Sequence, residues 1–124
     1  MDSLATATRL ARCGRFLEAL ETINRTTADH ERVAERVLRA EILERLGRHG
    51  QSRSIAESAL RSKEATQVER SRVELVLGLI AWEGGSTDGA IEHLQRSISY
   101  ARQSGESERA CWAQLQLLLL VGDR

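Results

Sequence analysis

The sequence predicts an all-α fold built from antiparallel pairs of helices. Apolar residues recur at steps of three and four along most of the chain, as one face of a helix requires. Glycines interrupt these stretches at nearly regular intervals, and the 124 residues include no proline that would break a helix. With 41% hydrophobic and 29% charged residues, the composition is that of a folded domain rather than a disordered chain.

We expect about seven helices, over residues 3–13, 15–27, 30–46, 50–62, 66–83, 87–103 and 107–121. The third helix shows the periodicity clearly, at Val33, Val37, Leu38, Ile42 and Leu46. The connections are short and polar, which predicts that consecutive helices pack antiparallel.

Glutamates followed four residues later by arginine support the helical prediction. The pairs are Glu21/Arg25, Glu35/Arg39, Glu41/Arg45, Glu44/Arg48, Glu57/Arg61 and Glu92/Arg96. This order stabilises an exposed helix by roughly 0.2–0.5 kcal/mol per pair. We therefore expect most of the arginines to lie on solvated helix faces.

Glycines are expected to end the helices. Gly14, Gly47, Gly85 and Gly122 each follow an apolar helical stretch, the usual place for a glycine in the left-handed conformation. After Gly85, the segment Ser86–Asp88 offers side-chain oxygens that can cap the next helix. The four glycines are 33, 38 and 37 residues apart, a period typical of a solenoid of helix pairs.

Small residues repeat in phase with these glycines. Seven residues before the first three glycines lie Ala7, Ala40 and Gly78, and five residues after them lie Ala19, Ser52 and Ala90. Small side chains at these offsets allow paired helices to approach closely where their axes cross. The fold prediction requires that these residues be buried between helices.

These residues resemble the tetratricopeptide repeat (TPR) family, which has small residues before and after a conserved turn glycine at such offsets. The third repeat is the most similar, with Gly78, Gly85, Ala90 and Ser97. The resemblance implies a right-handed superhelix, or α-α solenoid. The family's usual proline is missing, and Leu115 stands where a small residue belongs.

The resemblance implies one TPR-like domain over residues 1–124, with repeats at about 1–29, 30–65 and 66–104 and a lone helix at 107–121. The spacing exceeds the usual 34 residues, which implies longer helices, as in TPR-like arrays of bacterial signalling and transcription regulators. The chain begins within a first helix and stops just after a repeat glycine, so we expect it to be a fragment of a longer protein.

In the TPR family, the first helix of each pair lines a concave face. Counting from the glycines gives the candidate groove residues Thr8, Ala11, Arg12, Ala34, Val37, Glu41, Glu44, Arg45, Arg72, Leu75, Leu79, Trp82, Glu83, Arg109, Trp112, Gln116, Leu119 and Leu120. Tryptophan and arginine are enriched among interface anchors, so Arg72, Trp82, Arg109 and Trp112 are candidates to contact a partner peptide or helix. The alternative for either tryptophan is core packing between adjacent helices.

The last expected helix, 107–121, is apolar around much of its circumference. A terminal helix should present a polar outer face to solvent, so this one requires either a continuing array or a second copy of the chain. We expect a homodimer formed through Leu117, Leu118 and Val121.

No cofactor or metal site is expected. His30, His49 and His93 have no ligand-like spacing with one another or with Cys13 and Cys111. No hydrolase or metalloprotease motif is present, so we do not expect an enzyme.

Nucleic-acid and membrane binding are also not expected. The formal net charge is zero and only four aromatic residues are available for stacking on bases. No apolar run approaches the roughly 20 residues that a membrane span needs.

The sequence thus predicts a cytoplasmic, non-catalytic scaffold that binds a protein or peptide segment in a concave groove. The alternative is the sensor or oligomerisation region of a larger bacterial transcriptional regulator or signalling protein. A DNA-binding or ATPase domain elsewhere in the full-length protein would favour the alternative.

Overall fold

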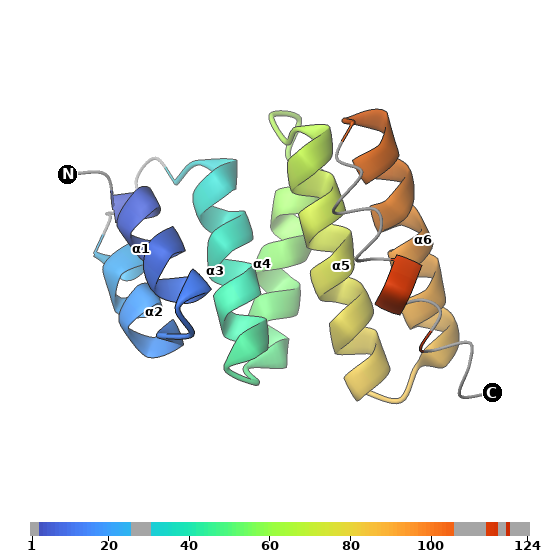
Figure 1. Ribbon diagram of the computed structural model, residues 1–124, viewed down its shortest axis with the longest axis horizontal. Coiled ribbons are helices and arrows are strands. Elements are labelled where there is room, and N and C mark those ends of the chain that lie inside the picture. The colour runs from blue at the N-terminus through green and yellow to red at the C-terminus, as the bar shows by residue number, and fades with distance from the viewer. Residues whose placement is uncertain (1–2, 26–30, 106–113, 117–118, 120–124) are drawn as a thin grey trace.

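A computed structural model describes residues 3–25, 31–105, 114–116 and 119 of the chain. Its six assigned helices are α1 (Ser3–Arg12), α2 (Phe16–Asn24), α3 (Val33–Arg45), α4 (His49–Arg61), α5 (Gln67–Glu83) and α6 (Thr87–Gln103). The helix pairs follow one another in chain order along the long axis of the molecule, from α1 and α2 at one end to α5 and α6 at the other (Figure 1). The described ranges contain no strand, which confirms the all-α prediction for this part of the chain. Most of the helix expected at 107–121 lies outside the described residues.

The described helices lie close to the predicted ranges. The largest differences are at the first connection, where α2 ends at Asn24 instead of residue 27 and α3 begins at Val33 instead of residue 30. A side chain of α3 helps to end α2, because the Arg39 guanidinium donates hydrogen bonds to the carbonyl oxygen of Ile23 (3.3 Å) and to Oδ1 of Asn24 (3.1 Å).

Three of the four predicted glycines end helices as expected. Gly14, Gly47 and Gly85 have φ angles of +80°, +78° and +86°, in the left-handed region that favours glycine. The backbone N–H of the residue after each glycine bonds a carbonyl oxygen in the last helical turn, at 2.8–2.9 Å, as in a Schellman motif. Gly122 lies outside the described residues.

Side chains cap the helices of the third pair. Thr66 and Glu69 form a reciprocal capping box at the start of α5: Thr66 Oγ1 accepts from the Glu69 N–H at 3.1 Å, and Glu69 Oε1 accepts from the Thr66 N–H at 2.9 Å. Ser86, one of the predicted caps, accepts from the Gly89 N–H at the start of α6.

The small residues lie between paired helices, as the fold prediction requires. Each of these residues is buried: Ala7, Ala19, Ala40, Ser52, Gly78 and Ala90. Ser52 Oγ of α4 donates a hydrogen bond of 2.6 Å to the carbonyl oxygen of Ala40 in α3. A Cβ atom added to Gly78 of α5 would lie only 3.1 Å from Cγ of Leu94 in α6.

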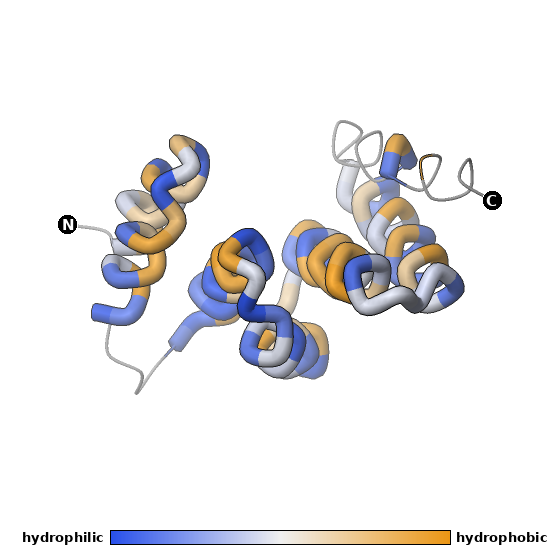
Figure 2. The backbone as a smooth tube through the Cα atoms, turned by 90° about the horizontal axis from the view of Figure 1, so that it is seen from below, coloured by the Kyte–Doolittle hydropathy of each residue, from blue (hydrophilic) through white to orange (hydrophobic). Residues whose placement is uncertain are grey.

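Each helix packs chiefly against the other member of its pair, so that α1 packs on α2, α3 on α4 and α5 on α6. Successive pairs are joined by contacts of α2 with α3 and of α4 with α5, and also by contacts between the first helices α1, α3 and α5. Every helix carries both hydrophobic and hydrophilic residues (Figure 2), as expected for helices that bury one face.

The arginines connect helices more than the predicted pairing along each helix suggests. Of the predicted pairs, Glu92 and Arg96 have side-chain atoms 3.9 Å apart. Arg39 instead pairs with Glu31, which precedes α3, and Glu41 pairs with Arg72 of α5. Similarly, Arg70 of α5 donates to the carbonyl oxygens of Leu60 and Ser62 at the end of α4. None of the described helices is both long enough and apolar enough to cross a membrane.

Candidate functional site

A groove opens between α1 and α3, with α5 at one side, and encloses a cavity of about 350 Å³. We call it the α1–α3 groove; its lining residues are Leu4, Thr8, Ala11, Arg12, Phe16, Ala34, Leu38, Glu41, Ile42, Arg45 and Arg72. More than half of these lining residues were predicted groove residues. The predicted ones come from the first helices of three successive pairs, α1, α3 and α5. The structure therefore brings together Arg12, Glu41, Arg45 and Arg72 as the sequence predicts.

The helical period explains why α3 lines this groove with one face. Ala34, Leu38, Glu41 and Arg45 follow one another at steps of four, three and four residues, which keeps them on one side of the helix. Leu38 and the neighbouring Ile42 are buried and form the apolar floor, while Arg45 is exposed at the rim.

Glu41 and Arg72 form a bidentate pair that links α3 to α5. The Nε atom of Arg72 lies 3.0 Å from Oε2 of Glu41, and its Nη2 atom contacts the other carboxylate oxygen. Burial alone would lower the pKa of the Arg72 guanidinium, but the hydrogen bond and the charge of Glu41 outweigh it, so that this pKa lies above its ordinary value. A partner can therefore use Arg72 only in competition with Glu41.

Among the described residues, two other guanidinium groups at the groove have no carboxylate within ion-pair distance. Arg45 lies over the ring of Phe16, with Cζ 5.5 Å from the ring centroid, in a cation–π contact. Arg12 is exposed at the end of α1. Within the described ranges, neither Arg12 nor Arg45 forms an ion pair.

Two predicted groove residues of α3 do not line the groove, and for them the prediction is wrong. Val37 is completely buried in the core shared by α3, α4 and α5. Glu44 is also buried, near the end of α3. Because α3 contacts α1, α2, α4 and α5, it buries more of its circumference than a helix with a single open face.

The remaining predicted site residues are not part of the α1–α3 groove. Leu79 and Trp82 of α5 are half-buried, and Trp82 packs against Ala90 and Leu94 of α6. For Trp82, this contact is the alternative stated above, namely core packing between adjacent helices. Gln116 is half-buried; Arg109, Trp112, Leu117, Leu118 and Val121 lie outside the described residues.

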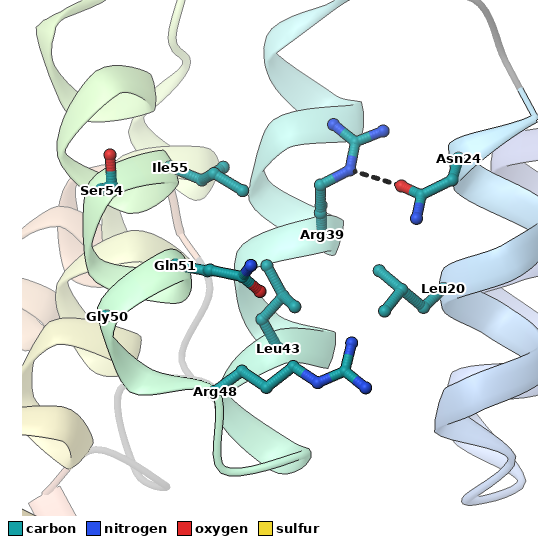
Figure 3. Close-up of a pocket in the computed structure, with 9 residues that line it drawn as sticks. All are labelled: Leu20, Asn24, Arg39, Leu43, Arg48, Gly50, Gln51, Ser54 and Ile55. Carbon is teal, nitrogen blue, oxygen red and sulfur yellow. Dashed lines mark hydrogen bonds between the residues drawn. The ribbon is translucent and has the colours of Figure 1, made fainter.

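A second cavity, of about 580 Å³, lies between α2 and α4 and is floored by α3. Figure 3 shows the residues of this α2–α4 pocket, which are Leu20, Asn24, Arg39, Leu43, Arg48, Gly50, Gln51, Ser54 and Ile55. Arg39 and Leu43 stand roughly 150° around α3 from the residues of the groove, so the two cavities open on opposite sides of this helix.

Arg39 has a mainly structural role in the α2–α4 pocket. Besides capping α2, its guanidinium forms an ion pair with Glu31, and its bond to Asn24 is visible in Figure 3. Burial lowers the pKa of Arg39. This pocket was not predicted from the sequence, because the repeat offsets select only faces of the first helices, whereas most of its lining comes from α2 and α4.

A cluster of Glu44, His49 and Glu83 also escaped the sequence analysis. The candidate ligand atoms of the three side chains all lie within 4.8 Å of one another. Burial raises the pKa of the Glu44 carboxyl, and the negative charge of Glu83 raises it further, against smaller opposite effects of Arg45 and His49. The sequence gives no spacing signal for this cluster, because Glu83 belongs to α5 and reaches Glu44 and His49 only through the packing of the helices.

Comparisons of the chain with family models, with curated proteins and with solved structures find no match.

Proposed function

We propose that this chain is a non-catalytic scaffold that binds a segment of a partner protein in the α1–α3 groove. The observation that carries the proposal is the convergence of predicted groove residues from three successive helix pairs on one cavity. Two guanidinium groups at this cavity form no ion pair with any residue that the structure describes. The cytoplasmic location expected from the sequence is part of this proposal.

The packing of the helices supports a curved array. The first helices contact one another from pair to pair, whereas the α2–α4 pocket separates two of the second helices. In a curved stack of helix pairs, the elements on the inner side approach one another more closely than those on the outer side. These contacts support a superhelix with α1, α3 and α5 on its concave face, and the TPR resemblance suggests that it is right-handed.

The chemistry of the groove favours a peptide that carries a carboxylate next to an apolar side chain. Leu38 and Ile42 offer an apolar floor, and Arg12 and Arg45 offer forked donors that match a carboxylate. Stacking on Phe16 restrains Arg45, which reduces the entropy lost when a ligand binds.

A random peptide library selected on the immobilised chain tests this proposal. We expect the enriched peptides to combine Asp or Glu with an apolar residue. Because a hydrogen bond to a charged group contributes about 1.5–3 kcal/mol, Arg45→Ala is expected to weaken their binding roughly ten- to hundredfold. Arg61→Ala, at an exposed arginine at the end of α4, is the matched control and should leave binding unchanged. Enriched peptides without acidic residues, or equal binding to both variants, would contradict the proposal.

Self-association, as in an oligomerisation region, is the second candidate function. Leu115 and Leu119 lie one helical turn apart in sequence and are 47% and 51% exposed, which is unusual for large apolar side chains. Both belong to the segment for which the sequence predicts a dimer contact.

Light scattering tests self-association, because it measures the molar mass of the chain in solution. We expect the wild-type chain to dimerise and Leu115→Glu/Leu119→Glu to be a monomer. Leu17→Glu, at a leucine that is 59% exposed on α2, should keep the dimer. A wild-type chain that stays monomeric at high concentration would rule out this function.

A further inference from the structure

Three side chains with metal-binding chemistry meet where α3 ends, α4 begins and α5 ends. Glu44 lies in the last turn of α3, His49 is the first residue of α4, and Glu83 is the last residue of α5. The tight turn at Gly47 brings His49 back beside Glu44, and packing of the third pair on the second adds Glu83.

Two groups of this cluster have no hydrogen-bond partner among the described residues: the Glu44 carboxylate and the Nε2 atom of His49. Glu44 is only 8% exposed, yet its carboxylate forms no hydrogen bond with any described residue. The Nε2 atom of His49 is also buried and lies 2.8 Å from Oε2 of Glu83, but without the geometry of a hydrogen bond. A buried ring nitrogen without a hydrogen bond, beside a carboxylate of a buried residue, needs an explanation, and a bound ion is one.

The electrostatic environment favours a cation. Two carboxylates face each other, and the C-terminal ends of α3 and α5, which carry partial negative charge, lie at the same place. Arg45, next to Glu44 in sequence, contacts Phe16 at the α1–α3 groove, and its charge affects the Glu44 carboxyl less than that of Glu83 does. Arg48, next to His49 in sequence, lines the α2–α4 pocket. A divalent cation between the carboxylates would replace their mutual repulsion by attraction.

We propose that Glu44, His49 and Glu83 form a binding site for a divalent first-row transition metal ion, with zinc as the best fit. Zinc takes imidazole nitrogen and carboxylate oxygen at about 2.0–2.2 Å, whereas magnesium and calcium prefer oxygen ligands alone. Three protein ligands leave a coordination position for water.

The separations between the side chains are close to what zinc requires. Tetrahedral ligand atoms at these bond lengths are about 3.3 Å apart. One pair of atoms in the cluster is 2.8 Å apart, and all of them lie within 4.8 Å. The side chain of Glu83 is 55% exposed and therefore free to make the remaining adjustment. Bound zinc would join the second helix pair to the third.

Isothermal titration with zinc chloride tests the site. The experiment uses the chelator-treated chain with Cys13→Ser and Cys111→Ser, so that thiols cannot bind the metal. We expect saturation at one zinc ion per chain through this site, and weaker binding of magnesium and calcium. His49→Ala and Glu83→Gln are each expected to weaken zinc binding at least about tenfold, because losing even a residue that only supports a metal ligand typically costs that much.

His93→Ala is the matched control. Nδ1 of His93 also lies close to a glutamate, 2.7 Å from Oε1 of Glu74, but among the described residues no third metal-binding side chain joins this pair. This variant should bind zinc as the parent chain does, and zinc should raise its melting temperature but not that of His49→Ala. The proposal is overturned if the parent chain binds no zinc, if His49→Ala and Glu83→Gln bind it as tightly as the parent, or if His93→Ala alone loses it. Circular dichroism of each variant confirms that it is folded before titration.

Discussion

Adding one methyl group at Gly78 should destabilise the contact between α5 and α6. The new Cβ atom would lie 3.1 Å from Cγ and 3.3 Å from Cδ2 of Leu94, closer than ordinary van der Waals contact. Leu94 is completely buried, and Cγ is the branch point of its side chain, so the clash cannot be relieved by moving a flexible end.

The size of the effect follows from two opposing contributions. Overpacking a core typically costs about 1–3 kcal/mol. Replacing glycine by alanine inside a helix contributes about 0.8–1 kcal/mol in the opposite direction. Gly78→Ala should therefore range from neutral to about 2 kcal/mol less stable than the wild type. Gly50→Ala is the matched control, because Gly50 also lies in a helix but a Cβ there meets nothing within 4 Å.

Urea denaturation followed by circular dichroism measures both variants. The free energy of unfolding of Gly78→Ala should lie about 1–3 kcal/mol below that of Gly50→Ala, because only the first variant suffers the overpacking. If Gly78→Ala were as stable as Gly50→Ala, the close approach of α5 and α6 at Gly78 would be wrong.

Three further substitutions test other parts of the fold. Thr66→Ala removes half of the capping box of α5 and should lower the free energy of unfolding by about 1 kcal/mol in urea; no change would mean that the cap is not formed. Gly85→Ala places a side chain at a φ of +86° and should cost about 1–2 kcal/mol although no atom lies near its Cβ; a gain in stability would exclude the left-handed turn. A double-mutant cycle of Glu41→Gln and Arg72→Met should give a favourable coupling energy of at least about 0.5 kcal/mol, and additive effects would show that the pair is not formed.

Local features of the sequence were enough to predict the helices and their pairing. The apolar period of α3 and the glycines at its end act within one or two helical turns, so they depend little on the rest of the chain. The small residues at the crossings were predictable because they recur in phase: Ala40 and Ser52 are in direct hydrogen-bonded contact, as their repeat positions require.

Interactions between distant segments were not predictable in the same way. Glu41 has an arginine four residues later in the sequence, but it pairs with Arg72 of another helix because α5 packs on α3. The positions of Val37 and Glu44 were wrong for a related reason, since the offsets taken from a repeat do not say how many neighbours each helix has. Glu83 joins Glu44 and His49 only after the second and third pairs have packed.

An NMR titration would show directly which surface binds the partner segment. The ¹⁵N-labelled chain is titrated with the tightest peptide from the library selection, and the amide shifts are mapped on the structure. We expect the largest changes at Thr8, Ala11 and Ala34, whose side chains line the α1–α3 groove. Changes centred instead on Leu20, Gln51 and Ser54 would place the ligand in the α2–α4 pocket and contradict the proposed function.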